Sequence, residues 1–357
     1  MISPRITAVE LAPLDLPMRQ PFVTALGDKR VSRNLLVRLR LDDGTVGIGE
    51  ASASLAWPSE TQAAMAAALR RLEGRLIGAP IRRFRRLSEL AWEIAGAHPT
   101  AVGALECALM DAYTRTKGVS LWRFYGSRRR SVTTALTLSA WAEPQAARAA
   151  ANAHAAGFRR LKVKVTGKNP DEDLRRIAAV CKAAPKAILW VDGNQGFAVK
   201  EAIRLARILR QKKFPIQLFE QPVRRENWDG LAQVQKEGGI PVAADESART
   251  VSEASWLIRK KTVQILNVKL AKSGLLGASE IVRRAKRAGM KLMIGCMAES
   301  AVGLSASVHF ACGTGAFDFV DLDSHLLVAS SDDAAGFQTR GARLTVYPAR
   351  PGCGARV

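Results

Sequence analysis

Three acidic residues in this sequence each follow directly on a short apolar run. Asp192 ends AILWVD, Glu220 ends PIQLFE and Asp245 follows IPVAA. If these runs are neighbouring parallel strands, their carboxyl ends lie together, and three carboxylates without counter-charges repel one another strongly. A divalent cation removes that repulsion, and oxygen ligands without a nearby histidine or cysteine favour Mg²⁺, or Mn²⁺, over Zn²⁺. The alternative, that each acid is an isolated helix cap or ion-pair partner, suits one acid better than three at equivalent strand ends.

Lysines flank these acids. Lys162 and Lys164 alternate with valines in LKVKV, so both side chains point to one face of a strand, which we expect to be the interior face. Two neighbouring buried ammonium groups lower each other's pKa, and this makes a lysine a base near neutral pH. Lys269 ends VQILNVK, on a strand across the acids. A substrate carboxylate on the metal then places its α-carbon between Lys164 and Lys269, and the metal stabilises the enediolate formed on proton loss. The alternative, surface lysines of a basic chain, does not explain their position at apolar strand ends.

The polar residues that end the apolar runs recur at a steady spacing. Successive members are 24 to 28 positions apart in the series Thr137, Lys164, Asp192, Glu220, Asp245, Lys269, Gly295 and Asp321. Amphipathic segments such as VKEAIRLARILRQ separate the runs. Strands that alternate with helices imply a parallel sheet, and eight units at this period predict a (β/α)₈-type, TIM-like barrel with reactive residues at the carboxyl ends of its strands. Neither GxGxxG nor GxxxxGKS/T follows a strand, which disfavours a nucleotide-binding open sheet.

The first third of the chain has a different pattern. Residues 3–50 are strand-like, with an Asp42-Asp43-Gly44 turn between two apolar runs, and residues 60–117 are helical and rich in alanine. We therefore expect an α+β capping domain at residues 1–125, the barrel with its catalytic site at 126–328, and a C-terminal segment at 329–357 that returns to the capping domain.

Composition limits the class of protein and its partners. The net charge is +22, but no recognition motif or aromatic stacking pattern accompanies the basic runs, so a solvated basic surface is preferred over specific nucleic-acid binding. The alternative of a non-catalytic, basic nucleic-acid-binding protein stays open. Five scattered cysteines without a CxxC argue against a disulfide framework and a zinc site and indicate a reducing cytoplasm. The sequence has no recognisable signal peptide or membrane span, so no membrane partner is expected.

Five segments together resemble the muconate lactonizing enzyme subgroup of the enolase superfamily: KVK (162–164), VDGNQ (191–195), FEQP (219–222), ADES (244–247) and NVKLAKSG (267–274). The resemblance covers essentially the whole chain. It implies that Lys164 and Lys269 are the acid/base pair, and that Lys162 contacts the substrate carboxylate and tunes Lys164. The implied Mg²⁺ ligands are Asp192, Glu220 and Asp245.

The segment VDLDS, at the end of the last expected strand, resembles the corresponding segment of the dipeptide epimerases of this subgroup. There, Asp321 and Asp323 would hold the N-terminal ammonium of the substrate, and two carboxylates on one face suit a cation. The strand-one residue Thr137 and the segment GCMAES, with Cys296 and Met297, also resemble that group and are expected at the substrate. The implied reaction is a 1,1-proton transfer at the α-carbon of the C-terminal residue of a dipeptide. An N-acylamino-acid racemase, an o-succinylbenzoate synthase, a muconate cycloisomerase and a merely capping aspartate remain the alternatives.

The side chains of the dipeptide stay undecided. They depend on the loops that we expect around residues 15–30 and 51–58. Relatives that act on Ala-Glu commonly carry an arginine after a TAL-like segment, whereas VTALGDKR has Gly27 there, with Arg30 as a candidate substitute. A glutamate, a hydrophobic residue or another side chain is therefore open. The resemblance also leaves a homo-oligomer open, because many relatives form symmetric assemblies.

Overall fold

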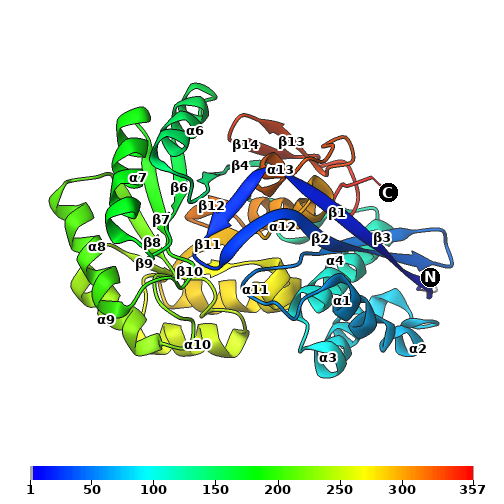
Figure 1. Cartoon of the computed structure of the whole chain (residues 1–357). Helices are drawn as coiled ribbons and strands as arrows, with labels where there is room; N and C mark the ends of the chain where they lie inside the picture. Colours follow the sequence, from blue (N-terminus) through cyan, green and yellow to red (C-terminus); the bar gives the residue numbers. More distant parts are fainter. Residues whose placement is uncertain (1–2, 357) are drawn as a thin grey trace.

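The structure, a computed structural model, describes residues 3–356. Within this range eight parallel strands follow one another in sequence order around a barrel (Figure 1). The first and last strands are joined by a hydrogen bond in which the Ala135 N–H donates to the Val320 carbonyl at 2.9 Å. The predicted TIM-like barrel is confirmed. Its strands are β5 (Leu136–Leu138), β6 (Arg160–Lys164), β7 (Ile188–Asp192), β8 (Ile216–Glu220), β9 (Val242–Ala244), β10 (Ile265–Val268), β11 (Lys291–Gly295) and β12 (Phe319–Asp321).

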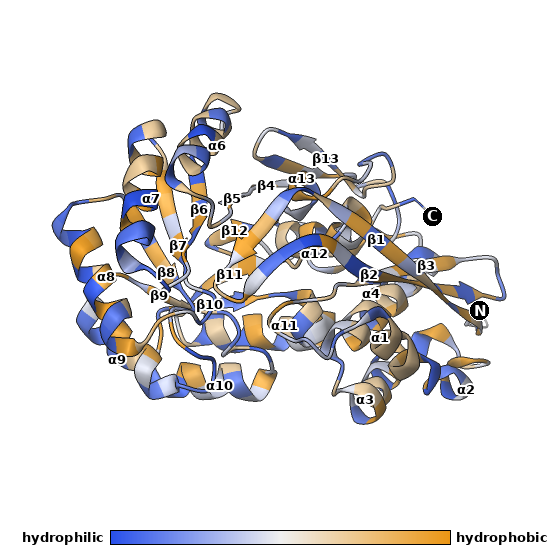
Figure 2. Cartoon of the chain, viewed as in Figure 1, coloured by the Kyte–Doolittle hydropathy of each residue, from blue (hydrophilic) through white to orange (hydrophobic). Residues whose placement is uncertain are grey.

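Helices cover the outside of the barrel. On α8 the arginines at 204, 207 and 210 are exposed, while Leu205 and Leu209 are buried against the strands. Figure 2 shows the same alternation of hydrophobic and hydrophilic colour along α8, α9 and α10. This burial of one apolar face is what the sequence pattern predicts. The helices are α6 (Glu143–Ala155), α7 (Pro170–Ala183), α8 (Val199–Gln211), α9 (Trp228–Gly238), α10 (Val251–Lys260), α11 (Leu270–Arg287), α12 (Ala301–Thr314) and α13 (Ser324–Leu327).

The lower interior of the barrel is apolar. Trp190 and Phe319 meet edge to face with 5.6 Å between their ring centroids. They belong to a buried cluster with Ala135, Leu218, Ala243, Ile265 and Met293. Because this layer fills the barrel below, the polar side chains two residues further along the strands are confined to its mouth.

A second unit precedes the barrel. An antiparallel sheet of β1 (Ile6–Thr24), β2 (Gly27–Leu41) and β3 (Val46–Ala51) packs on helices from the segment that was expected to be helical. Gly47 and Gly49 of β3 allow the closest approach, because a Cβ there would lie 2.2 Å and 1.9 Å from the carbonyl oxygens of Ala108 and Ala104. The helical elements are α1 (Gln62–Arg70), α2 (Glu73–Leu76), a 3₁₀ turn (Ile81–Arg83), α3 (Phe84–Ala95), α4 (Pro99–Thr116) and α5 (Leu121–Phe124).

The β1–β2 hairpin extends as far as the mouth of the barrel (Figure 1). The loop expected at residues 15–30 is instead largely the paired end of this hairpin, where Phe22 lies opposite Lys29 and Thr24 opposite Gly27. Prolines 13, 17 and 21 favour a loop, but β1 is an edge strand, where a missing N–H costs no ladder bond. Ser139 of the barrel donates its hydroxyl to the Val23 carbonyl at 2.9 Å and so attaches the hairpin tip to the barrel.

The C-terminal segment forms a small sheet and then reaches the first unit. Strands β13 (Phe337–Arg340) and β14 (Arg343–Val346) pair with β4 (Ser131–Thr133). Further along, the Cys353 N–H donates to Asp111 of α4 at 2.6 Å, and Arg115 donates to the Ala355 carbonyl at 2.6 Å.

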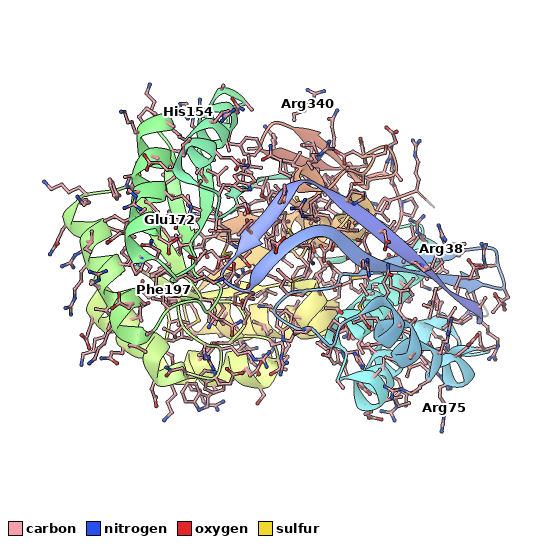
Figure 3. All side chains as sticks on the ribbon, viewed as in Figure 1. Arg38, Arg75, His154, Glu172, Phe197 and Arg340 are labelled. Carbon is pink, nitrogen blue, oxygen red and sulfur yellow. The ribbon has the colours of Figure 1, made fainter. Side chains whose placement is uncertain are left out.

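Basic side chains are spread over the surface of the protein. Arg75 and Arg340 extend outward from two distant parts of the fold (Figure 3). In the part of the chain that the structure describes, no helix combines the length and the apolar character needed to cross a membrane. The thiols of all five cysteines are free.

Candidate active site

The pairing of neighbouring barrel strands places the predicted residues at the same height, at the mouth of the barrel. Lys164 pairs with Asp192, Asp192 pairs with Glu220, and Gly295 pairs with Asp321 across neighbouring strands. Asp245 follows β9 directly. All of the predicted polar residues here are buried, with Asp192 and Glu220 completely inaccessible to solvent. Side chains from sequence positions more than 150 residues apart therefore meet at the mouth.

Lys162 lies at the centre of the acids. Its Nζ is 2.9 Å from Asp192 Oδ2, 2.9 Å from Glu220 Oε2 and 2.7 Å from Asp321 Oδ2. Burial by itself lowers the pKa of Lys162, but the three carboxylates outweigh burial and raise it well above its ordinary value. The expectation that a neighbouring ammonium lowers this pKa is therefore wrong for Lys162, because the nearest charges are negative.

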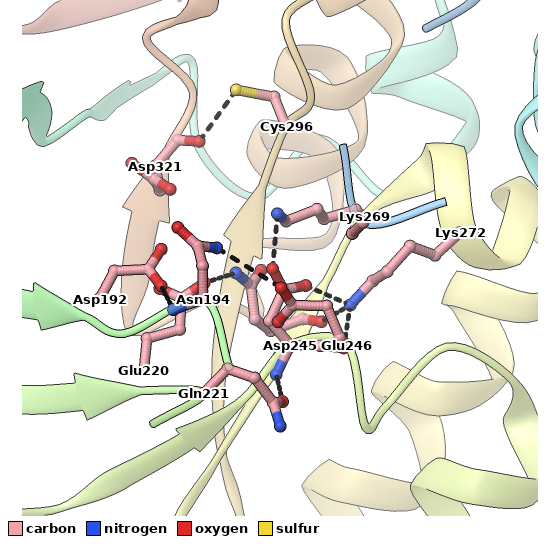
Figure 4. A network of polar contacts seen from close by, with 12 residues as sticks. Asp192, Asn194, Glu220, Gln221, Asp245, Glu246, Lys269, Lys272, Cys296 and Asp321 are labelled. Atoms are coloured by element: carbon pink, nitrogen blue, oxygen red, sulfur yellow. Dashed lines mark hydrogen bonds and ion pairs between the residues drawn. The ribbon is translucent and has the colours of Figure 1, made fainter. Parts of the chain in front are cut away.

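Lys164 and Lys269 come from opposite sides of the barrel, since β6 and β10 are four strands apart in the sheet order. Lys164 donates to Asp192 Oδ2 at 2.6 Å and to Asn194 Oδ1 at 2.9 Å. Lys269 donates to Asp245 Oδ2 at 2.7 Å (Figure 4). The carboxylates of the cluster thus separate the two amines.

Lys272 is a buried member of this cluster that the sequence pattern did not single out. Its Nζ donates to Asp245 Oδ1, to the Asp245 carbonyl and to the Asn267 carbonyl, each at 2.7 Å (Figure 4). These bonds use all three ammonium protons. Asp245 therefore has one oxygen held by Lys272 and the other facing Lys269. A second lysine three positions after Lys269, in the apolar segment NVKLAKSG, was the available signal.

The carboxylates differ in their pKa values. Burial raises the pKa of Asp192, but Lys162 and Lys164 outweigh it and lower that pKa to about 2. Burial and the neighbouring Asp192 raise the pKa of Glu220 to about 7. Glu220 Oε1 accepts from Asn267 at 2.8 Å, whereas Oε2 accepts no well-directed hydrogen bond although it is close to Lys162. We attribute this to an ion pair without hydrogen-bond geometry.

Asp192, Glu220 and Asp245 share the mouth of the barrel, but lysine ammonium groups lie between them. Within residues 3–356, no three His, Cys, Asp or Glu side chains already converge on one point that could hold a metal ion. The donor set nevertheless consists of oxygen alone, and Glu220 keeps a buried oxygen without a directed hydrogen bond. Both properties suit a hard divalent cation.

The acid pair Asp321 and Asp323, at the carboxyl end of β12, forms another side of the site. The Thr137 N–H donates to Asp323 Oδ2 at 2.6 Å, and the Cys296 thiol donates to the Asp321 carbonyl at 3.3 Å. Asp321 Oδ1 is buried and has no hydrogen-bond partner. Burial and the adjacent Asp321 raise the pKa of Asp323 to about 7. Two close carboxyl groups with a free acceptor can receive a cationic group.

A cavity opens above these residues, between the barrel mouth and the hairpin. Met297 lines it, as do Lys162, Lys164 and Lys269. Gly27 supplies no side chain, and Arg30 is exposed and does not line the cavity. The apolar wall of the cavity consists of Met18, Phe22, Leu26, Leu55, Trp57, Met297 and Leu327.

Lys29 is the cation that the hairpin contributes to this cavity, and the sequence pattern did not single it out either. Its Nζ donates to the Ala53 carbonyl at 2.5 Å, and burial lowers its pKa to about 8. The side chain lies inward because Lys29 is paired with Phe22, whose ring centroid is 5.7 Å from Lys164 Nζ. Only the hairpin pairing reveals this orientation.

Comparison with known proteins agrees with this geometry. Residues 6–126 match the family described as mandelate racemase / muconate lactonizing enzyme, N-terminal domain, and residues 145–357 match the one described as enolase C-terminal domain-like. The chain belongs to the mandelate racemase/muconate lactonizing enzyme family. The resemblance to the muconate lactonizing subgroup of the enolase superfamily is thereby confirmed.

Members of this family that resemble the chain along its full length include enzymes named for their action on dipeptides. An aromatic dipeptide epimerase of Herpetosiphon aurantiacus is 38% identical over 339 residues, which cover 95% of each chain. An L-Ala-D/L-Glu epimerase of Thermotoga maritima is 36% identical and covers 96% of this chain and 99% of its own. A dipeptide epimerase of Enterococcus faecalis, solved with Mg and L-Leu-L-Tyr, superposes with a TM-score of 0.92 at 27% identity and covers 99% of this chain and 100% of its own.

Proposed function

We propose that this protein is a Mg²⁺-dependent dipeptide epimerase that transfers the α-proton of the C-terminal residue of a dipeptide. The observation that carries the proposal is the position of Lys164 and Lys269 on opposite sides of one carboxylate cluster. A two-sided pair of amines suits a reaction in which a proton leaves one face of a carbon and returns on the other. The sequence similarity to epimerases, which extends over almost the whole chain, supports the same reaction.

Asp192, Glu220 and Asp245 are the residues that would hold the cation. They offer oxygen ligands alone, which fits Mg²⁺ and also Mn²⁺, and the Enterococcus relative was solved with Mg. When bound, the cation supplies positive charge to the substrate carboxylate while the α-carbon loses its proton.

The remaining residues hold the substrate and move the proton. Lys164 takes the α-proton from one epimer while Lys269 donates to the other face, and the roles reverse for the opposite epimer. Lys162 contacts the substrate carboxylate. Asp321 and Asp323 receive the N-terminal ammonium. Thr137 fixes Asp323 through its N–H, and Cys296 and Met297 line the substrate cavity.

The cavity wall supports a preference for an apolar side chain on the epimerised residue. Leu26, Leu55 and Trp57 of the first unit line the cavity, and Gly27 and Arg30 place no guanidinium in it. Lys29 is already bonded to the Ala53 carbonyl and has a lowered pKa, which weakens it as a partner for a glutamate side chain.

The experiment that tests the function is mass spectrometry of a mixed dipeptide library in D₂O with Mg²⁺. We expect uptake of one deuteron by a few dipeptides, chiefly those with an apolar C-terminal residue, and loss of uptake with a chelator. Reaction of N-acylated amino acids or succinylated acids in place of dipeptides would assign the chain to a rival activity of the subgroup.

The acid pair provides a second prediction. In the double variant Asp321→Asn/Asp323→Asn, the kcat/KM for dipeptides should fall by about a hundredfold. Neutral amides cannot make the charge-assisted hydrogen bonds that the two carboxylates make to the substrate ammonium. For the N-acetylated form of the same dipeptide, which has no ammonium, the loss should be much smaller and should reflect only the contact of Asp321 with Lys162. Asp333→Asn, at an exposed position, is the matched control. Unchanged dipeptide kinetics in the double variant would refute the ammonium assignment.

Three further elements complete the proposal. They are the division at residues 1–125, 126–328 and 329–357, assembly into a homo-oligomer, and a cytoplasmic location, where free thiols persist. The alternative of another class, a basic nucleic-acid-binding protein, rests on the charge of +22. Gel retardation that persists at physiological salt, without any metal-dependent proton exchange, would favour it.

A further inference from the structure

A second cavity, of about 390 Å³, lies beside the candidate active site. Its walls come from β1, β5, α6 and α13, on the side of the barrel where α6 stands (Figure 1). The inner end is apolar and includes the buried residues Leu138, Ala153 and Phe158. The outer rim carries the exposed polar side chains of Gln20 and Asn152 and the exposed cationic side chain of Arg19. The cavity is therefore an apolar recess with a polar edge.

Small side chains of α6 leave this space open. Ala149 and Ala153 line the cavity from one face of α6, four positions apart, and Ala156, which caps the C-terminus of the helix, continues this side. Protein interiors are normally packed without voids larger than a water molecule. Larger residues at these three positions would fill the recess, so the alanine-rich face accounts for it.

The recess shares a wall with the cavity above the catalytic lysines. Met18, Phe22, Thr137 and Leu327 line both. Thr137 in this wall donates its N–H to Asp323, beside the unpartnered Asp321 Oδ1. A dipeptide whose ammonium lies at this acid pair therefore has its N-terminal α-carbon next to the shared wall, and the recess lies beyond it.

We propose that this recess, bounded by β1, β5, α6 and α13, binds the N-terminal side chain of the substrate and selects dipeptides with a large apolar or aromatic residue there. The inference rests on the proposed function. It concerns the N-terminal residue, which does not react, and is independent of the preference argued for the epimerised residue. Glycine and alanine are too small to reach past Met18 and Leu327 into the recess, whereas leucine and phenylalanine reach it.

The test compares dipeptides that differ only at the N-terminal residue. All of these dipeptides carry the C-terminal residue that the enzyme accepts best in the library. The kcat/KM of the wild type should be at least about ten times higher with leucine or phenylalanine at the N-terminus than with glycine. The reason is that even one additional methylene group in an apolar pocket changes kcat/KM by about tenfold or more. Ala153→Leu should remove the preference and leave the glycine dipeptide within about twofold. Ala155→Leu, on the exposed face of the same helix and outside the recess, is the matched control.

A second variant covers the case in which Ala153→Leu disturbs folding. Ala156 is exposed at the rim, so Ala156→Leu narrows the recess without entering the core and should also lower kcat/KM selectively for the large residues. Equal kcat/KM for glycine and phenylalanine dipeptides in the wild type, or an equal loss for both in the variants, would overturn the proposal. These results require a wild type that exchanges dipeptides; absence of exchange with every dipeptide refutes the proposed function itself, and the recess assignment with it.

Discussion

Replacement of Lys269 by alanine is expected to lower net epimerisation about a thousandfold, while α-proton exchange of one epimer continues. Net inversion needs an amine on each face of the α-carbon, and Lys269 is the amine on the β10 side. Lys164 donates to Asp192 and Asn194, which Lys269 does not contact, so Lys164 should keep its position in the variant. The epimer whose proton faces Lys164 should therefore still exchange it with solvent.

The measurement is deuterium incorporation in D₂O, started separately from each epimer and followed by NMR. Lys164→Ala should give the mirror-image result, with exchange of the other epimer alone. Lys260→Ala, an exposed lysine at the end of α10, is the control for loss of a positive charge. Equal loss of exchange from both epimers in a folded Lys269→Ala protein that still binds Mg²⁺ would contradict the assignment of one base to each face.

The second large effect is expected from Glu220→Gln, which should weaken Mg²⁺ binding at least about a hundredfold. Glu220 is fully buried and lies between Asp192 and Asp245 in the strand order. An amide has nearly the same shape as the carboxylate but lacks its charge, so one anionic ligand is lost with little change in packing. Substitution even of groups that only orient metal ligands costs ten- to hundredfold in metal affinity.

Calorimetric titration of the protein with Mg²⁺, without substrate, measures this effect independently of turnover. Glu226→Gln is the control, because Glu226 is an exposed glutamate bonded to Arg225. Circular dichroism should report folded protein for both variants. An unchanged Mg²⁺ affinity in Glu220→Gln would remove Glu220 from the proposed ligand set and would require another carboxylate in its place.

The sequence alone determined the barrel and the chemical types at its mouth. Each strand is encoded locally, as an apolar run followed by a polar residue, and the steady period of these units depends on no distant contact. This local pattern is sufficient to assign Asp192, Glu220 and Asp245 to neighbouring strand ends. The same kind of local signal predicts the Asp42-Asp43-Gly44 turn, which lies between β2 and β3.

Which charges touch was decided only by the tertiary structure. Lys162 contacts Asp321, 159 positions away, and the carboxylates of Asp192, Asp321 and Glu220 together raise a pKa that the local sequence suggests is low. Lys272 is recognisable as a partner of Asp245 only because α11 brings its side chain to the β9 end. Such pairs depend on chain segments that meet after folding, so no local pattern encodes them.

The walls of the substrate cavity also needed the tertiary structure. The prolines of β1 suggest a loop, whereas pairing with β2 extends the strand to Thr24 and turns Lys29 inward. The recess beside α6 arises because alanines on one helix face β1 across an unfilled space. Strand pairing and cavity volume depend on contacts between segments that are far apart in the sequence. The reacting groups, in contrast, lie at strand ends that each segment specifies by itself. The sequence therefore determined the chemistry, and the tertiary structure decided the space around it.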